Sequence, residues 1–201
     1  MAKGHFIVFE GIDGSGKSTQ AALLARALEA RGASVLLTRE PSDSAAGLRL
    51  KRLAKEGRKG ISLDEEIALF QEDRREHCER SVNPALEAGK WVVCDRFWFS
   101  TLAYQGALGA DMGKIEQESR REFPAPDLVV YLEISPQAGL ERIRKNREGG
   151  LAPAYEKKDF LEKVVKNYAR QAGSGWLRLD ALRPQEELAG EILKAVLALK
   201  G

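Results

Sequence analysis

The sequence of 201 residues predicts an α/β fold in three layers, a five-stranded parallel sheet flanked by helices on both of its faces. Short apolar runs alternate along the chain with helical patterns, which is typical of a parallel sheet with helical crossovers. The runs are continuously apolar, as expected for strands that are covered on both faces. The length and the 43% hydrophobic content are those of one globular domain, which we expect to span residues 1–201.

Five apolar runs have the length and the flanking residues of buried strands. Each run is followed by polar or turn-forming residues. The predicted strands are Phe6–Glu10, Ser34–Thr38, Trp91–Cys94, Leu128–Glu133 and Trp176–Leu179.

Helical patterns fill the gaps between the strands. Ser62 and Glu65 form a capping-box pattern, which predicts a helix from there to about residue 87. Ser135 followed by Pro136 predicts another start, because proline is favoured in the first turn of a helix. Further helices are predicted from about residue 17, and over 155–172 and 184–199.

A glycine-rich turn joins the first strand to the first helix and reads G-x-x-x-x-G-K-S. Glycines let successive backbone N–H groups point at one anion, and the helix that follows adds the positive end of its dipole. In this context the pattern predicts a site for the phosphates of ATP, with Lys17 at the terminal phosphates and the Ser18 hydroxyl on Mg²⁺. The residues of this predicted ATP site are Gly11, Ile12, Asp13, Gly14, Ser15, Gly16, Lys17, Ser18 and Thr19.

Polar residues also end the second and third strands, at the sheet edge where such folds bind ligands. Asp95 ends the third strand, and an acidic residue there is the usual partner of a phosphate loop in holding Mg²⁺. Arg96 follows directly and places a cation beside the metal. Arg39 ends the second strand, where it either holds a second phosphate-bearing ligand or lies in a solvated turn.

Three residues of the long predicted helix share one face, because they are spaced i, i+4 and i+7. They are Phe70, Arg74 and His77. Together they would stack on a base and read its edge. Taken singly, Phe70 fits a core position and His77 a surface position, so that only Arg74 beside Phe70 favours base binding.

The remaining composition excludes several classes of function. The formal net charge of +2 gives no nucleic-acid footprint, and Cys78 and Cys94 form neither a metal motif nor a disulfide framework. No Ser/His/Asp or Cys/His constellation occurs. Because we find no signal peptide and no long apolar span, we expect a cytoplasmic protein without a membrane partner.

Several motifs together resemble those of bacterial thymidylate kinase, a nucleoside monophosphate kinase with the P-loop NTPase fold. They occur in the expected order from the first strand to the fourth, and the block that begins at Asp95 is the most specific. The matching motifs are E-G-I-D-G-S-G-K-S-T from Glu10, T-R-E-P from Thr38, L-F-x-x-D-R-x-x-H from Leu69, D-R-F-x-x-S-T-x-A-Y-Q-G from Asp95, and P-D-L from Pro126.

The resemblance implies transfer of a phosphoryl group from ATP·Mg²⁺ to dTMP, and it implies a role for each matching residue. Asp13 would hold the 3′-hydroxyl of dTMP, and Arg39 and Arg96 would engage its phosphate. Lys17 would serve the ATP phosphates, and Ser18 and Asp95 the metal. The base and sugar pocket would be formed by Phe70, Arg74, Ser100, Thr101, Tyr104 and Gln105.

Such a transfer needs positioning, charge neutralisation and exclusion of water, and therefore a closing lid. A basic segment at about 142–154, which runs into Gly149 and Gly150, is the predicted lid. Its catalytic arginine is left open among Arg142, Arg144 and Arg147, with the last two as the favoured candidates. The resemblance also implies a homodimer.

Three segments depart from the pattern of the family. Ser15 stands where some members carry an arginine, so that the lid must supply that charge. Residues 153–156 read P-A-Y-E where D-R-aromatic-E is usual, and 42–44 read S-D-S where G-G-T or G-G-S is common. Lys51 and Arg52 lie about where one arginine is expected.

Three alternatives stay open beside a dTMP kinase. One is a kinase of another pyrimidine nucleotide or of a deoxynucleoside. A second is a regulatory module that binds nucleotides and has lost catalysis through its altered lid. A third is a GTPase switch, which the absence of an N-K-x-D guanine-reading segment disfavours.

Overall fold

The computed structural model describes residues 4–58, 60–146, 157–173 and 175–199. Within them a parallel sheet of five strands has the order β2-β3-β1-β4-β5. The strands are β1 (His5–Glu10), β2 (Val35–Arg39), β3 (Trp91–Asp95), β4 (Leu128–Glu133) and β5 (Trp176–Asp180). The predicted strands are confirmed to within one residue at each end.

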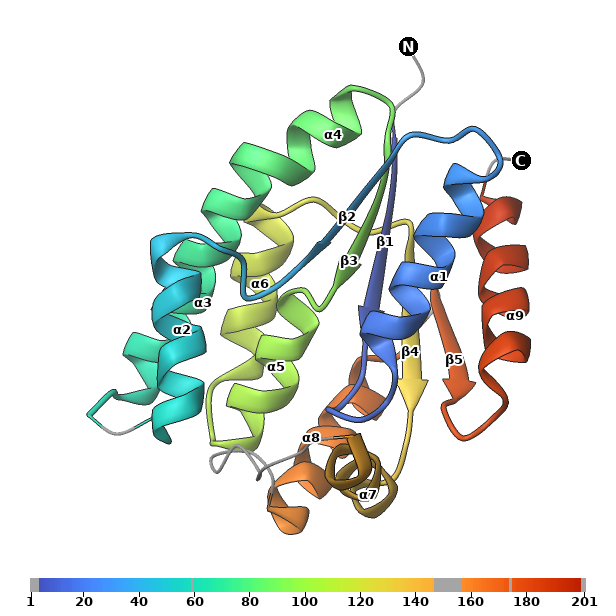
Figure 1. Ribbon diagram of the computed structural model, residues 1–201. Coiled ribbons are helices and arrows are strands. Elements are labelled where there is room, and N and C mark those ends of the chain that lie inside the picture. The colour runs from blue at the N-terminus through green and yellow to red at the C-terminus, as the bar shows by residue number, and fades with distance from the viewer. Residues whose placement is uncertain (1–3, 59, 147–156, 174, 200–201) are drawn as a thin grey trace.

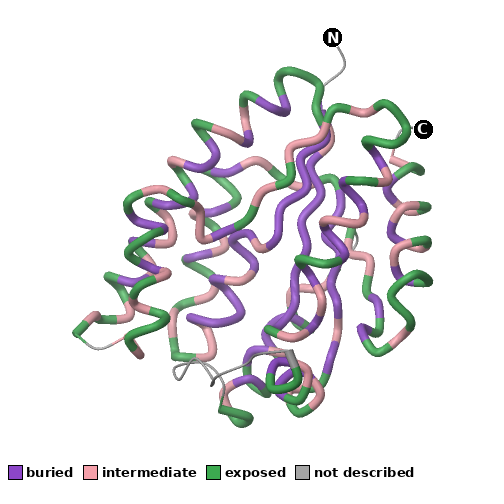
Figure 2. Tube along the Cα trace, in the orientation of Figure 1, coloured by how far each residue is buried: buried purple, intermediate pink, exposed green. Residues whose placement is uncertain are grey.

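Two layers of helices cover the sheet (Figure 1). One face packs against α1 (Lys17–Glu29) and α9 (Gln185–Ala198) through a core that includes Ile7, Leu24 and Ile192. The other face packs against the helices that follow β2 and β3 through a core that includes Phe6, Val82 and Leu102. Figure 2 shows the central strands buried along their length, which agrees with their continuous apolar sequences.

The second helical layer contains α2, the long helical segment after Ser62, and the helices between β3 and β4. Their bounds are α2 (Ala45–Glu56), α3 (Leu63–His77), a π-helical stretch η1 (Cys78–Val82), α4 (Asn83–Glu87), α5 (Trp98–Ala107) and α6 (Met112–Glu122). The predicted capping box is present, since Ser62 and Glu65 exchange hydrogen bonds. The prediction of one uninterrupted helix to residue 87 missed the π-helical stretch, for which the sequence carries no pattern signal.

Two further helices lie near the carboxyl end of the sheet. They are α7 (Pro136–Asn146) and α8 (Lys158–Gln171). The predicted start of α8 at residue 155 and most of the predicted lid, 147–154, lie outside the described residues.

The strand order brings three functional segments together at the carboxyl ends of neighbouring strands. Strands β2, β3 and β1 are neighbours in parallel register, and Arg39 pairs with Asp95 at the end of that register. The phosphate loop begins where β1 ends. Residues that are far apart in the sequence therefore meet at the carboxyl end of the sheet.

Candidate active site

The phosphate loop is fixed by glycines in conformations that other residues rarely adopt. Gly14 has φ +82°, and a Cβ atom there would lie 2.3 Å from the carbonyl oxygen of Gly139 in α7. Gly11 has φ +143°, and its Cβ would lie 2.6 Å from the carbonyl oxygen of Leu132. The loop therefore packs tightly on β4 and α7, and it leads into α1 at Lys17.

Lys17 is held inside the loop rather than in solvent. Its side chain is 6% exposed, its Nζ donates to the carbonyl oxygen of Ile12 at 2.9 Å, and Asp13 Oδ1 lies 4.0 Å away. Burial and the nearby charge of Arg96 lower the pKa of Lys17 to about 8, which the charges of Asp13 and Asp95 oppose. A buried ammonium whose charged form is disfavoured by burial and by a neighbouring cation is suited to receive an anionic ligand.

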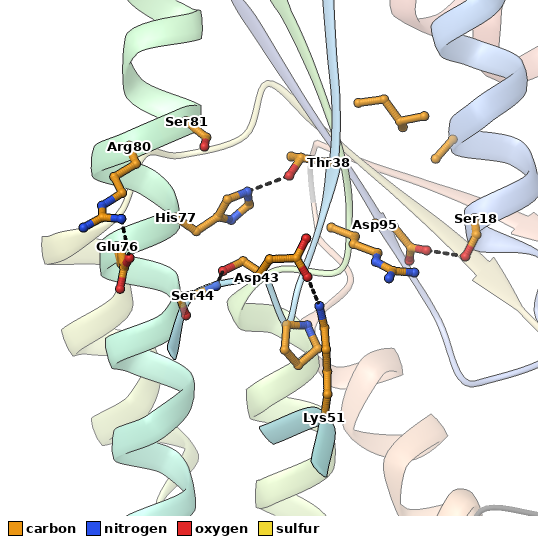
Figure 3. A pocket seen from close by; sticks show the side chains of 15 residues that line it. Ser18, Thr38, Asp43, Ser44, Lys51, Glu76, His77, Arg80, Ser81 and Asp95 are labelled. Carbon is orange, nitrogen blue, oxygen red and sulfur yellow. Dashed lines mark hydrogen bonds and ion pairs between the residues drawn. The ribbon is translucent and has the colours of Figure 1, made fainter. Parts of the chain in front are cut away.

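The residues predicted to hold Mg²⁺ lie together. The Ser18 hydroxyl contacts Asp95 Oδ2, and Figure 3 shows the two side chains facing each other across the end of the sheet. The other carboxylate oxygen, Oδ1, is buried and has no hydrogen-bond partner in the described part of the chain. An unused carboxylate oxygen beside a hydroxyl fits a hard cation that takes its other ligands from water and phosphate.

Arg96 lies where the third strand turns into α5. It has φ +75°, and its backbone N–H donates to the carbonyl oxygen of Phe9 at 2.9 Å. Its guanidinium donates to Asp13 Oδ1 at 2.6 Å, to Ser100 Oγ at 2.9 Å and to the Tyr104 hydroxyl at 3.4 Å. Arg96 therefore links the phosphate loop to α5.

Glu10 is the buried carboxylate that holds this turn, and the sequence reasoning gave it no role. Its oxygens accept from the backbone N–H of Phe97 at 2.8 Å and of Ser100 at 3.2 Å. They also accept from the Ser100 hydroxyl at 2.6 Å and from the Tyr168 hydroxyl at 2.8 Å. Burial raises the pKa of Glu10, and the charge of Arg96 and these hydrogen bonds oppose the rise. An acidic residue at the end of a strand that is otherwise buried and apolar was the signal available in the sequence.

A pocket of about 200 Å³ lies between α2, α3 and α5, beside Arg96. All six residues that were predicted to form the base and sugar pocket line this cavity. The lining residues from the prediction are Phe70, Arg74, Ser100, Thr101, Tyr104 and Gln105. Asp13 and Arg96 form the wall of the same pocket on the side of the phosphate loop.

Ser100 contributes to this pocket differently from the prediction. Its hydroxyl contacts Glu10 and Arg96, and it lies 2.9 Å from the Tyr168 hydroxyl. A serine hydroxyl has one proton and two lone pairs, so these contacts use its hydrogen-bonding capacity. In this geometry Ser100 orients Arg96.

The expectation that Phe70, Arg74 and His77 act as one base-reading face is wrong for His77. The ring is 5% exposed and is turned toward β2, where Nε2 lies 2.7 Å from Thr38 Oγ1 and Nδ1 lies 3.2 Å from Glu40 Oε1. The surface position expected for a lone histidine is wrong for the same reason. Helical spacing predicts which residues share a face of the helix, but not the direction in which each side chain points.

Arg39 lies in a second cavity, of about 530 Å³, which runs along the edge of β2 (Figure 3). The cavity also includes Ser18 and Asp95, so Arg39 faces the same space as the predicted metal ligands. Lys51 lines both this cavity and the base pocket, and Asp43 Oδ1 holds its Nζ at 2.6 Å. Of the two cations that follow the altered 42–44 segment, the structure therefore places Lys51, and not Arg52, at the site.

The segment 42–44 is tied down by a buried carboxylate. Asp73 accepts from the Ser42 backbone N–H at 2.9 Å and from the hydroxyls of Ser42 and Ser44 at 2.5 and 2.6 Å. Ser44 in turn caps α2 by accepting from the Gly47 N–H at 2.9 Å. The two serines thus shape the loop through their side chains, a role that the sequence pattern did not reveal.

Among the described arginines of the lid region, Arg142 reaches the phosphate loop. Its Nη1 donates to the Gly14 carbonyl oxygen at 3.4 Å and its Nη2 to the Ala181 carbonyl oxygen at 2.8 Å. It lines a cavity of about 270 Å³ together with Asp13, Lys17 and Ser18. The structure places Arg144 on the exposed surface of α7, and Arg147 lies outside the described residues.

The described residues contain no cluster of three or more His, Cys, Asp or Glu side chains suited to a metal ion. Among the helices described, none has the length and apolar character needed to cross a membrane. Cys78 and Cys94 are both buried and free, and burial raises the pKa of each thiol.

Comparison with known proteins identifies the family. The family model described as "Thymidylate kinase" matches residues 9–192. A "Probable thymidylate kinase" of Archaeoglobus fulgidus is 39% identical over 94% of this chain and 93% of its own length. A "Thymidylate kinase" of Akkermansia muciniphila is 40% identical over 96% and 92%, and one of Desulfotalea psychrophila is 44% identical over 80% and 78%.

These relatives come from archaea as well as bacteria, so the resemblance is to the family as a whole. The family has the P-loop NTPase fold, in agreement with the parallel sheet and the phosphate loop described above. By its sequence along nearly its whole length, the chain belongs to the thymidylate kinase family.

Proposed function

We propose that this chain transfers the γ-phosphoryl group of ATP to dTMP, giving dTDP and ADP. One observation carries the assignment to a transfer between two nucleotides. The phosphate-loop cavity and the base pocket are separate cavities, and Asp13 lines both of them. Two nucleotides bound there would meet with their phosphates near Asp13 and Arg96.

The residues on the donor side have distinct tasks. The phosphate loop and Lys17 bind the terminal phosphates of ATP, and the N-terminus of α1 favours their charge. Mg²⁺, when bound by Ser18 and Asp95, neutralises charge on the transferring phosphates. Arg142 completes the donor side from α7.

On the acceptor side Arg96 and Arg39 bind the phosphate of dTMP. Arg96 has a fixed orientation, because Asp13, Ser100 and Tyr104 each receive one of its hydrogen bonds. The acceptor phosphate is itself the nucleophile, so no general base is required. The protein contributes position and charge, which is the main source of rate in phosphoryl transfer.

The base pocket supports a pyrimidine acceptor. Phe70 offers a ring for stacking, and Arg74, Thr101 and Gln105 offer polar groups in a buried wall. Tyr104 lines the same pocket, and we expect it to pack under the sugar of dTMP, where it would disfavour a 2′-hydroxyl.

The same proposal includes a single kinase domain over residues 1–201 with a lid at about 142–154, in which Arg144 and Arg147 are the catalytic arginines. It also includes a bacterial type of enzyme, Mg²⁺ as cofactor, a cytoplasmic location and a homodimer. Light scattering of the purified chain tests the dimer. Alanine substitution of Arg142, Arg144 and Arg147 one at a time tests which lid arginine is catalytic. Substitution of the catalytic one should lower kcat by ~10³-fold or more.

The experiment for the function is a coupled assay of ADP release with ATP·Mg²⁺ and a panel of nucleoside monophosphates. We expect turnover with dTMP and its loss by ~10³-fold in Arg96→Ala. Arg31→Ala, which removes an exposed arginine in the turn after α1, is the matched control and should keep wild-type rates.

Each other outcome favours a different function. Turnover only with another monophosphate would keep the mechanism and replace the substrate. Tight binding of dTMP without turnover would instead favour a regulatory module that binds nucleotides.

A further inference from the structure

A chain of polar groups runs from the half-buried Thr38 on the edge strand β2 through the buried His77 and Glu40 to the base pocket. Thr38 Oγ1 lies 2.7 Å from His77 Nε2, and His77 Nδ1 lies 3.2 Å from Glu40 Oε1. The other oxygen of Glu40 accepts from Arg74, from Nε at 2.8 Å and from Nη2 at 2.7 Å. Figure 3 shows the first link, with the His77 ring directed at Thr38.

The direction of each hydrogen bond follows from the chemistry of the groups. An arginine only donates and an ionised carboxylate only accepts, so Glu40 accepts a hydrogen bond from the Nδ1–H of His77. In the neutral imidazole Nε2 then carries the lone pair, and the Thr38 hydroxyl donates to it. The histidine is thereby fixed in one tautomer and one ring orientation.

Glu40 and the surrounding rings hold the guanidinium of Arg74 in place. Arg74 is 1% exposed, its centre lies 5.4 Å from the Phe97 ring and 5.5 Å from the Phe123 ring, and Nη2 also donates to Thr101 Oγ1 at 3.2 Å. Its remaining nitrogen, Nη1, is buried and has no hydrogen-bond partner among the described residues. Arg74 lines the base pocket, and Nη1 is the nitrogen of its guanidinium whose donors no described residue uses.

We propose that His77 and Glu40 are positioning residues that set which base the pocket accepts, by holding Arg74 Nη1 as a fixed donor. This inference rests on the proposed function, which assigns the pocket to the acceptor base. A fixed donor matches the 4-carbonyl oxygen of thymine. It rejects the 4-amino group of cytosine, because two donors would then face each other and Nη1 would stay unsatisfied.

His77 acts on the pocket only through Glu40. Its ring lines the cavity along β2 and not the base pocket, whereas Glu40 and Arg74 line the base pocket. Removing His77 leaves one carboxylate oxygen of Glu40 without its donor, so that the carboxylate and the guanidinium can rotate. The effect should therefore appear in the choice of base and in KM, with little change in kcat, because the base contact is made equally before and during transfer.

The test measures binding of dTMP and dCMP by calorimetry, and kcat/KM for both, in wild type and in three variants. His77→Leu removes both hydrogen bonds of the ring, and should lower the preference for dTMP over dCMP by ~10- to 100-fold. His77→Gln, whose amide can donate to Glu40 and accept from Thr38, should recover most of the preference. Thr38→Val removes only the far hydroxyl and should lower the preference by less than His77→Leu.

Val82→Ala is the matched control for stability, because it opens space in the core beside the same helical segment without touching the polar chain. It should lower the melting temperature and keep the wild-type preference. If His77→Leu and Thr38→Val melt earlier but keep the preference within about twofold, the positioning role is refuted and His77 is structural.

Binding measurements separate this inference from the proposed function. A wild type that prefers dTMP in binding, together with an unchanged preference in the His77 variants, overturns only the positioning role. A wild type that binds dTMP and dCMP alike overturns the base assignment on which the role depends.

Discussion

The buried position of Lys17 leads to a prediction about the pH dependence of ATP binding. Burial and Arg96 lower the pKa of its ammonium from 10.5 to about 8 in the protein without nucleotide. At pH 7 about nine tenths of the Lys17 side chains are charged, and at pH 9 about one tenth. Triphosphate bound in the loop favours the charged form, so ATP binding at pH 9 should take up close to one proton.

The magnitude follows from the same pKa. If only the charged form binds ATP well, the affinity at pH 9 should be ~10-fold lower than at pH 7, which corresponds to ~1.4 kcal/mol. Without nucleotide the pKa of Lys17 is lower in the folded than in the unfolded protein. At pH values between these two pKa values, the folded protein therefore binds fewer protons than the unfolded protein. Its free energy of unfolding should therefore rise by up to ~3 kcal/mol as the pH increases from about 8 to 10.5.

Titration calorimetry with ATP·Mg²⁺ in two buffers that differ in ionisation enthalpy measures the proton uptake directly. Lys17→Arg is the control, because its charge persists at both pH values and no proton should be taken up. An uptake below about 0.2 protons in wild type at pH 9, or equal uptake in Lys17→Arg, would refute the reasoning.

Three further predictions concern other parts of the site. Glu10→Gln removes an acceptor shared by two hydroxyls, so it should lower the free energy of unfolding by ~3 kcal/mol, which corresponds to a drop of roughly 6 to 12 °C in melting temperature. Tyr168→Phe should cause a smaller drop, and equal stability of Glu10→Gln and wild type in thermal unfolding would contradict this prediction. Arg142→Ala should raise KM for ATP by ~10-fold in steady-state kinetics and leave KM for dTMP unchanged, whereas Lys145→Ala, an exposed cation on the same helix, should change neither value. Gly14→Ala forces a Cβ to within 2.3 Å of the Gly139 carbonyl oxygen at a positive φ, so ATP binding measured by calorimetry should weaken by at least ~10-fold, and wild-type affinity would show that the loop adapts freely.

Much of the fold was predictable because its signals are local in the sequence. A continuous apolar run such as Val8 and its neighbours identifies a strand that is buried on both faces, and Ser62 with Glu65 identifies the start of a helix. The glycine pattern around Lys17 likewise specifies its own backbone. The π-helical stretch at Cys78–Val82 has no such pattern and was missed.

The candidate site was predictable where a motif carries its residues, and not where packing decides the orientation of a side chain. The motif at Asp95 located Arg96, Thr101, Tyr104 and Gln105 beside one pocket. It did not show that the Ser100 hydroxyl is used by Glu10 as well as by Arg96, since the contact with Glu10 joins residues 90 positions apart. Tyr168 had no signal, because its contact with Glu10 depends on how α8 packs.

The two cavities that meet at Asp13 divide the enzyme into parts that can change independently. The donor side is built from the loop between β1 and α1 together with Arg142, whereas the base pocket takes its walls from α2, α3 and α5. A change in the pocket walls can therefore alter the choice of acceptor without disturbing the use of ATP. The ion pair between Asp13 and Arg96 connects the two parts. A substitution at either of these residues therefore affects both the donor side and the base pocket.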